Sequence, residues 1–141
     1  MKVYFAASIR SGRDMAPTYC QLIDYLKSKG HEVLTEHIGD SNLTGAGEKG
    51  MTDSEIFTRD LKLLARSHVT IAEVTTPSTG VGYEIGFSLN LEHRVLCLYQ
   101  HQPDRKLSAM IAGNPRLTVK EYNTVEQACA HMDDFIQKML L

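Results

Sequence analysis

Glu84 is the carboxylate in this sequence best placed to act as a nucleophile. It stands in an almost uncharged stretch that opens a predicted helix, VGYEIGF over residues 81–87. Burial opposes ionisation of such a carboxylate, whereas the positive end of the helix dipole favours it. Gly82 and Gly86 leave room for a ligand to approach. A glutamate here could also complement the helix dipole without taking part in any reaction.

Asp60 is the second candidate carboxylate. Ile56 precedes it by four residues and Leu64 follows it by four, so its helical face is partly apolar and it could retain a proton. One ionised and one protonated carboxylate are what retaining cleavage of an N- or O-glycoside requires. The alternative without chemistry is a solvated Asp60 that pairs with Arg59.

A candidate anion site lies where a strand passes into the helix that carries Glu84. There, Gly80 and Gly82 permit close approach to the backbone, and free N–H groups at the helix start face an anion. The spacing GxGxxxG suits a single phosphate and differs from the dinucleotide fingerprint. Ser8 and Arg10, at the end of the first predicted strand, would complete an anion cradle with Ser78. The alternatives are a turn that uses glycine for positive φ and a surface arginine.

The other reactive side chains give weaker indications of function. Tyr4 lies mid-strand, where a buried hydroxyl must find a partner. His37 follows the second predicted strand and could stack on a base. The six histidines form no HExxH or HxH pair, so we expect no metal site. The sequence GFSLN (86–90) lacks the second glycine of the nucleophile elbow that serine hydrolases carry, so we do not expect a serine hydrolase.

The elements that position these residues follow from the hydrophobic pattern. Five apolar runs alternate with segments of helical period, which predicts an α/β protein: one domain over residues 1–141, with a doubly wound five-stranded parallel sheet, Rossmann-like or flavodoxin-like, and helices on both faces. Ligands of such sheets bind at the carboxyl ends of the strands. The predicted strands are Lys2–Ser8, Glu32–Glu36, Val69–Val74, Val95–Tyr99 and Leu117–Glu121.

Helix signals fill the gaps between these strands. Apolar residues at helical spacing from Tyr19 predict a first helix, with Pro17 in its opening turn and Gly30 as its C-terminal cap. Two capping boxes, TDSE from residue 52 and TVEQ from residue 124, open two more. The glycine-rich stretch over residues 39–50 is predicted to be a loop over the carboxyl ends of the strands.

Composition limits the partners and the compartment. A formal charge of −2 over 141 residues offers no cationic surface for nucleic-acid polymers or membranes, so we expect a small ligand. Cys20, Cys97 and Cys129 are odd in number and form no CxxC, which favours buried reduced thiols. We see no signal peptide and no apolar run of spanning length, and expect a soluble cytoplasmic protein, with the nucleus as a second compartment.

Taken together, these residues resemble a known family. The resemblance rests on YFxxSIR (4–10), LTEH (34–37), DL (60–61), PSxGVGYExG (77–86) and LSAMI (107–111), in order over nearly the whole chain. They are similar to the 2'-deoxynucleoside 5'-phosphate N-hydrolases, the monophosphate-specific branch of the nucleoside 2-deoxyribosyltransferase superfamily. The loop over residues 39–50 matches this family less well and leaves the base preference open.

The resemblance implies hydrolysis of the N-glycosidic bond of deoxynucleoside 5'-monophosphates, without a cofactor. By position, Glu84 would attack C1' to form a glycosyl-enzyme, and Asp60 would protonate the departing base or orient Glu84. Tyr4 would lie near the 2' position and exclude ribonucleotides, since relatives that act on ribonucleotides tend to carry phenylalanine there. Ala7 replaces the usual glycine of the family and would slightly narrow the sugar pocket.

The resemblance also implies binding roles and a homodimer. Ser8, Arg10, Ser78, Gly80 and Gly82 would hold the 5'-phosphate, with Ser108 contributed by the neighbouring subunit. The base would be lined by Ile9, His37 and Met110.

Two other functions compete with this interpretation. A nucleoside 2-deoxyribosyltransferase would use the same carboxylates, but such enzymes usually take unphosphorylated nucleosides and would gain nothing from phosphate-binding groups. A non-catalytic nucleotide-binding or signalling module could share the fold. A response-regulator receiver, however, should offer acidic residues after its first strand, which here ends at Ser8.

Overall fold

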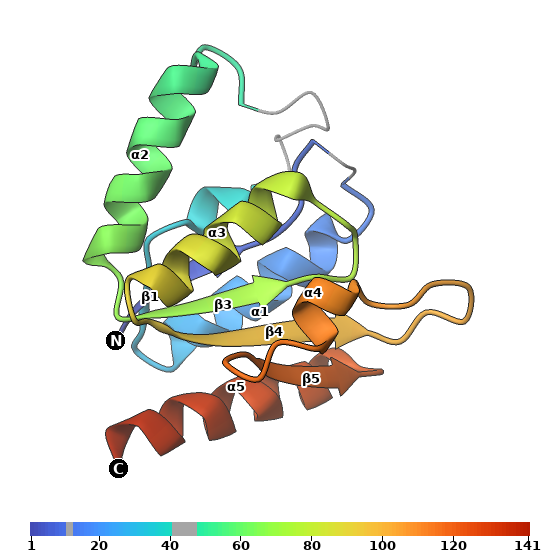
Figure 1. The fold of residues 1–141 in the computed structure, drawn as a ribbon. Helices are drawn as coiled ribbons and strands as arrows, with labels where there is room; N and C mark the ends of the chain where they lie inside the picture. The colour runs from blue at the N-terminus through green and yellow to red at the C-terminus, as the bar shows by residue number, and fades with distance from the viewer. Residues whose placement is uncertain (11–12, 41–47) are drawn as a thin grey trace.

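The computed structural model describes residues 1–10, 13–40 and 48–141. Five parallel strands form one sheet in the order β2-β1-β3-β4-β5, with helices on both faces (Figure 1). This confirms the predicted α/β fold, which is flavodoxin-like. The strands are β1 (Lys2–Ala6), β2 (Glu32–Val33), β3 (Val69–Glu73), β4 (Arg94–Gln100) and β5 (Thr118–Tyr122). The helices are α1 (Ala16–Ser28), η1 (Glu36–Gly39), α2 (Asp53–Arg66), α3 (Thr79–Asn90), α4 (Ala109–Ala112) and α5 (Val125–Leu140).

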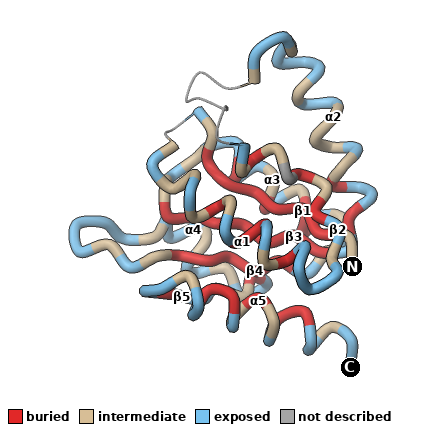
Figure 2. Tube along the Cα trace, turned by 180° about the vertical axis from the view of Figure 1, so that it is seen from behind, coloured by how far each residue is buried: buried red, intermediate tan, exposed pale blue. Residues whose placement is uncertain are grey.

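Two apolar layers enclose the sheet because side chains alternate along each strand. Along β1, Val3 and Phe5 belong to the layer packed by α1 and α5, whereas Tyr4 and Ala6 belong to the layer packed by α3. The three central strands, β1, β3 and β4, form the most continuously buried part of the chain (Figure 2). The sheet is therefore a rigid base for residues at the strand ends.

The predicted helix boundaries are confirmed. Pro17 lies in the first turn of α1, and Gly30 follows its C-terminus at φ +87°, which glycine adopts without strain. Both reciprocal hydrogen bonds of each capping box form, between Thr52 and Glu55 and between Thr124 and Gln127. Local sequence alone thus sets the starts of α2 and α5.

Several predictions were wrong in detail. β2 pairs only over Glu32–Val33, because the chain then turns into η1. The Thr35 hydroxyl accepts from the Phe5 N–H at 2.8 Å and donates to the Phe5 carbonyl oxygen at 2.6 Å. β1 ends two residues earlier than predicted, and α4 was not predicted. Cys20 is half-buried on α1, with Sγ 3.6 Å from a carboxylate oxygen of Asp24, whereas the other two cysteines are buried as expected.

α2 lies at one side of the molecule, and its N-terminal part projects beyond the other elements (Figure 1). Leu64 is its only buried residue, although the helix has a distinctly apolar face. Within the described ranges, no helix combines the length and apolarity that crossing a bilayer would require. Of the predicted loop over residues 39–50, positions 41–47 lie outside the described residues.

Candidate active site

A pocket of about 420 Å³ opens at the carboxyl ends of β1 and β3. The strand order reverses between these two strands, which is where sheets of this kind bind ligands. Its wall brings together the turn after β1, the segment before α2, α2 itself and the first turns of α3. The lining residues are Ala7, Ile9, Arg10, Glu48, Ile56, Ser78, Thr79, Gly80, Val81 and Glu84.

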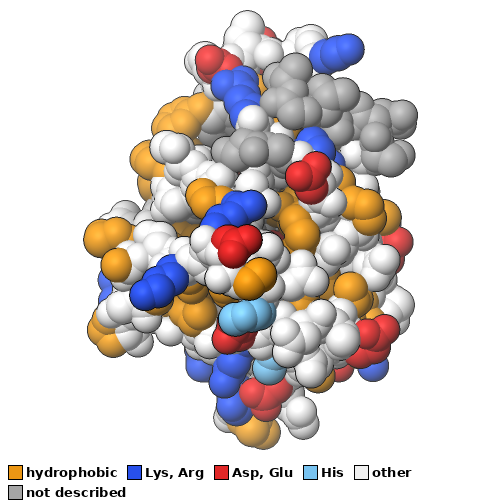
Figure 3. Space-filling view, turned by 90° about the vertical axis from the view of Figure 1, so that its right-hand side faces the viewer, with side chains coloured by type: hydrophobic (Ala, Val, Ile, Leu, Met, Phe, Trp, Pro, Cys, Tyr) orange, Lys and Arg blue, Asp and Glu red, His pale blue; other side chains and the backbone are white. Residues whose placement is uncertain are grey.

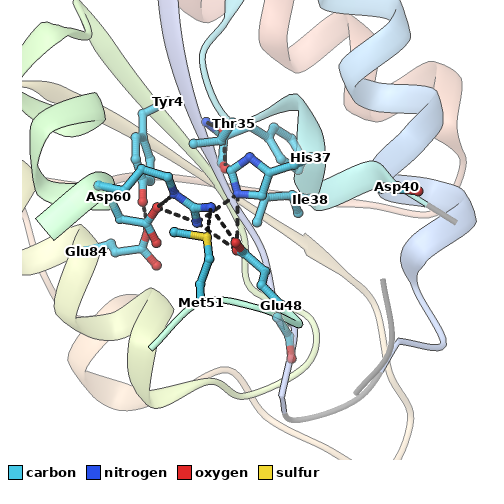
Figure 4. A network of polar contacts seen from close by, with 12 residues as sticks. Tyr4, Thr35, His37, Ile38, Asp40, Glu48, Met51, Asp60 and Glu84 are labelled. Atoms are coloured by element: carbon cyan, nitrogen blue, oxygen red, sulfur yellow. Dashed lines mark hydrogen bonds and ion pairs between the residues drawn. The ribbon is translucent and has the colours of Figure 1, made fainter. Parts of the chain in front are cut away.

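Glu84 and Tyr4 form the centre of this site. The Tyr4 hydroxyl, on an almost fully buried side chain of β1, donates a hydrogen bond to the Glu84 carboxylate from α3. Asp60 lies beside this pair (Figure 4). The sheet and two helices thus bring the three predicted catalytic residues together.

The electrostatics of the two carboxylates differ. Burial and the nearby Asp60 charge raise the pKa of Glu84 to about 7, although the Tyr4 hydrogen bond and the Arg59 charge oppose this rise. Burial also raises the pKa of Asp60, against the hydrogen bond and charge of Arg59. Burial and the charge of Glu84 raise the pKa of Tyr4, which keeps its hydroxyl a donor.

We expect kcat/KM to fall as the pH drops below about 7, by about tenfold per pH unit, because an attacking carboxylate must be ionised. An ordinary glutamate would lose activity only near pH 4.5. In Tyr4→Phe, Glu84 loses the hydrogen bond that lowers its pKa, so the midpoint should move to higher pH. A pH profile of kcat/KM for both proteins measures this, and a midpoint near 4.5 in the wild type would contradict it.

Arg59 links Asp60, one of the two candidate carboxylates, to the segment before α2. Its guanidinium donates two hydrogen bonds to Glu48, the second at 2.7 Å, and reaches Asp60 at 2.9 Å. It also contacts His37 Nε2 at 3.3 Å and Met51 Sδ at 3.4 Å (Figure 4). The side chains of Arg59, Glu48 and Asp60 are 28%, 12% and 24% exposed, so these ion pairs are shielded from solvent.

Asp60 does pair with Arg59, as the alternative without chemistry expected, but this carboxylate is only partly exposed and lies beside Glu84. Glu48 was missed by sequence reasoning. It belongs to no helix or strand, and no periodic pattern points to it. Arg59, adjacent to Asp60, was predicted only as a partner of a solvated Asp60.

The start of α3 carries the candidate anion-binding groups. Ser78 is the N-cap, where its Oγ accepts from the Val81 N–H at 3.3 Å. Gly80 does not have positive φ, and a Cβ there would meet only Ser78 Oγ, at 3.9 Å. The interpretation of a turn that needs glycine for positive φ is therefore wrong, and the free space at this position faces the pocket.

The other phosphate candidates are less directly placed. Arg10 lies on the rim of the pocket, where it pairs with Asp53 at 2.6 Å, and both side chains are well exposed. Ser8 is fully buried, and its carbonyl oxygen accepts from Arg13 at 3.3 Å. Ser8 is not among the residues that line the pocket.

Gly82, Ser108 and Met110 line a second pocket, of about 620 Å³, which shares Ser78 with the first. Ser108 caps the short helix α4, and Met110 is 80% exposed. The two pockets also share Thr79 and Val81 and so adjoin, but Ser108 and Met110 line only the second of them and Glu84 only the first.

The three residues predicted to line the base, Ile9, His37 and Met110, lie in different places. Ile9 lines the pocket that contains Glu84, and His37 lies on η1 against Arg59.

In the described part of the chain, no three His, Cys, Asp or Glu side chains gather as metal ligands. Figure 3 views the side of the molecule towards which the strands run, where acidic, basic and apolar side chains are interspersed.

The fold and the site together define a flavodoxin-like α/β protein with two carboxylates and a helix N-terminus around one pocket. The chain belongs to the nucleoside 2-deoxyribosyltransferase family, whose model matches residues 3–132. This confirms the resemblance inferred from the sequence motifs.

Relatives with names of their own lie within this family. A Nematostella vectensis protein, provisionally named 2'-deoxynucleoside 5'-phosphate N-hydrolase 1, is 49% identical over 126 residues, covering 86% of this chain and 84% of its own. The 5-hydroxymethyl-dUMP N-hydrolase of Tetraodon nigroviridis is 43% identical over 141 residues and 96% of both chains. That of Danio rerio is 40% identical over 129 residues, covering 89% of this chain and 90% of its own.

Solved structures share the fold at lower identity. The CMP N-glycosidase of Clostridium botulinum superposes with a TM-score of 0.69 at 19% identity, over 94% of this chain and 98% of the other. The 2-deoxyribosyltransferase of Bacillus psychrosaccharolyticus gives 0.63 at 17% identity, over 91% and 90%. These matches support the flavodoxin-like architecture.

Proposed function

We propose that this protein hydrolyses the N-glycosidic bond of 2'-deoxynucleoside 5'-monophosphates, giving the free base and 2-deoxyribose 5-phosphate. The observation that carries this proposal is one pocket lined by both Glu84 and the anion-binding start of α3, Ser78 to Gly80. A carboxylate for the sugar and backbone N–H groups for a phosphate are what such a substrate requires. The names of relatives at 40–49% identity point to the same reaction.

In the proposed reaction, a Glu84 carboxylate oxygen attacks C1' and forms a glycosyl ester. The bond between C1' and the base nitrogen breaks, and that nitrogen keeps the electron pair and takes a proton from Asp60. A water molecule then gives a proton to Asp60 and attacks C1', which releases 2-deoxyribose 5-phosphate and frees Glu84. In the free protein Asp60 is an ionised partner of Arg59, so in this scheme it takes up a proton when the substrate binds, and burial, which raises its pKa, favours that uptake.

Tyr4 and Arg59 prepare these carboxylates. Before substrate binds, the Tyr4 hydroxyl fixes one Glu84 oxygen, and because Tyr4 is rigidly buried it leaves little space beside the sugar. Arg59 holds Asp60 through its guanidinium.

The binding groups proposed for the substrate divide between the two ends of the nucleotide. Ser78, Gly80 and rim-placed Arg10 would bind the phosphate, and Ile9 and His37 the base. In a homodimer, Ser108 of a second copy would complete the phosphate site. Met110 of that copy would reach the base, since in its own chain neither residue lines the pocket that contains Glu84.

A panel of deoxy- and ribonucleoside 5'-monophosphates, scored for base release by chromatography, tests the proposal. It should include 5-hydroxymethyl-dUMP, the substrate in the names of two relatives. We expect release from the deoxynucleotides and no release from the corresponding nucleosides. Transfer of deoxyribose from unphosphorylated deoxyguanosine to added adenine would instead identify a transferase, the second candidate.

We expect Tyr4→Phe to relax the preference for deoxynucleotides over ribonucleotides by about tenfold, since loss of the hydroxyl opens space near the 2' position. The ratio of kcat/KM for paired deoxy and ribo substrates measures this preference. Tyr99→Phe is a matched control, because the Tyr99 hydroxyl donates to the Arg105 carbonyl oxygen, at 3.0 Å, and Tyr99 does not line the pocket that contains Glu84. An unchanged ratio in Tyr4→Phe would remove the proposed selectivity role.

A further inference from the structure

A fully buried carboxylate at the end of the central strand has no part in the reaction proposed above. Glu73 is the last residue of β3, and its exposed fraction is 0%. The alternation along β3 turns it towards the same side of the sheet as Ile71, the side that α1 and α5 cover. A buried acidic group at this depth is costly unless its surroundings compensate it.

Three hydrogen-bond donors surround this carboxylate. The Thr75 N–H donates to Oε1 at 2.7 Å, and the Thr75 hydroxyl donates to Oε2 at 2.8 Å. The Tyr122 hydroxyl, from the end of β5, donates to Oε2 as well. Burial raises the pKa of Glu73, and these hydrogen bonds oppose that rise.

Thr75 is held from a second side. Its hydroxyl oxygen also accepts from the backbone N–H of Gln100, the last residue of β4, at 2.8 Å. The Glu73 carboxylate and Thr75 therefore connect the ends of β3, β4 and β5.

The segment held in this way leads directly to the anion site. Residues 74–78 connect β3 to α3, and Thr75 comes three residues before Ser78, the N-cap of α3. Ser78 and Gly80 line the pocket that contains Glu84. We propose that Glu73 is a positioning residue for phosphate binding: by fixing Thr75 it fixes the turn that aims Ser78 and the first N–H groups of α3 at the phosphate. This rests on the proposed function.

The sign of one substitution separates positioning from electrostatics. Glu73→Gln keeps the shape of the side chain but removes its charge and brings an N–H₂ group to donors that need an acceptor. If Glu73 acted only through its negative charge, removal of the charge would tighten binding of an anionic substrate. If it positions the turn, the same change weakens that binding.

We therefore expect Glu73→Gln to raise KM for a deoxynucleoside 5'-monophosphate about tenfold, with kcat within about twofold of the wild type. Inhibition by 2-deoxyribose 5-phosphate should weaken by a similar factor. Tyr122→Phe, which removes a single donor, should raise KM by about threefold. The matched control is Tyr25→Phe, because Tyr25 donates to Asp133 between α1 and α5, away from the pocket, and its KM should not change.

An unchanged or lowered KM in Glu73→Gln, or a fall in kcat alone, would overturn the proposal. If Glu73→Gln does not fold, Tyr122→Phe and Thr75→Val decide the question, with Thr75→Ser as the variant that should restore KM. A wild-type chain that releases no base would overturn the proposed function instead. The two failures are therefore distinguishable.

Discussion

Glu84→Gln should lower base release from deoxynucleoside 5'-monophosphates by about 10⁴-fold or more, while binding of the nucleotide persists. The amide keeps the shape of the side chain but is a poor nucleophile, so no glycosyl ester forms. Chromatography of released base measures the rate, and calorimetric titration measures binding. Mass spectrometry of the wild type, quenched during turnover, should detect one 2-deoxyribose 5-phosphate bound to the peptide that contains residue 84.

Glu126→Gln is a matched control for this experiment. Glu126 lies in the first turn of a helix, α5, whereas Glu84 lies in the second turn of α3, and Glu126 does not line the pocket. We expect turnover close to that of the wild type. Full activity of Glu84→Gln would sink the assignment of Glu84 as nucleophile.

Asp60→Asn should lower kcat by about 10²- to 10⁴-fold for natural bases, because the departing nitrogen loses its proton donor. The loss should shrink for a substrate whose leaving group departs as a stable anion, such as 4-nitrophenyl 2-deoxyriboside 5-phosphate. The ratio of kcat for the two kinds of substrate is the measurement. An equal loss with both would show that Asp60 only orients Glu84.

Asp134→Asn serves as the control, since Asp134 forms an exposed ion pair with Lys138 at 2.9 Å on α5. Its rates should match the wild type with both substrates. A second effect is expected in Asp60→Asn itself. Without the negative charge that raises the pKa of Glu84, the acid limb of the pH profile should move to lower pH.

The sequence predicts this fold well where local signals are strong. Alternating apolar runs predict the parallel sheet, and the capping boxes at Thr52 and Thr124 mark the first residues of α2 and α5. The prediction fails at β2. There, the side chain of Thr35 replaces strand pairing by bonding the backbone of Phe5, a tertiary contact that leaves no periodic trace in the sequence.

The candidate site divides in the same way. Glu84 is recognisable because a charged residue interrupts an apolar stretch, and the same signal marks Glu73 at the end of a buried strand. The pairing of Arg59 with Glu48 is not recognisable, because it joins a helix to an irregular segment eleven residues away. The positions of side chains that depend on such contacts between separate segments cannot be predicted without the folded structure.

The weak anchoring of α2 divides the proposed machinery between two levels of local stability. Tyr4 and Glu84 belong to elements packed on the sheet, whereas Asp60 lies on a helix that buries only Leu64. Native proteins open in cooperative units, and elements with little buried apolar surface open most readily. Partial opening of α2 would thus withdraw the proton donor and leave the nucleophile in place, so activity could be lost on heating well before the sheet itself unfolds.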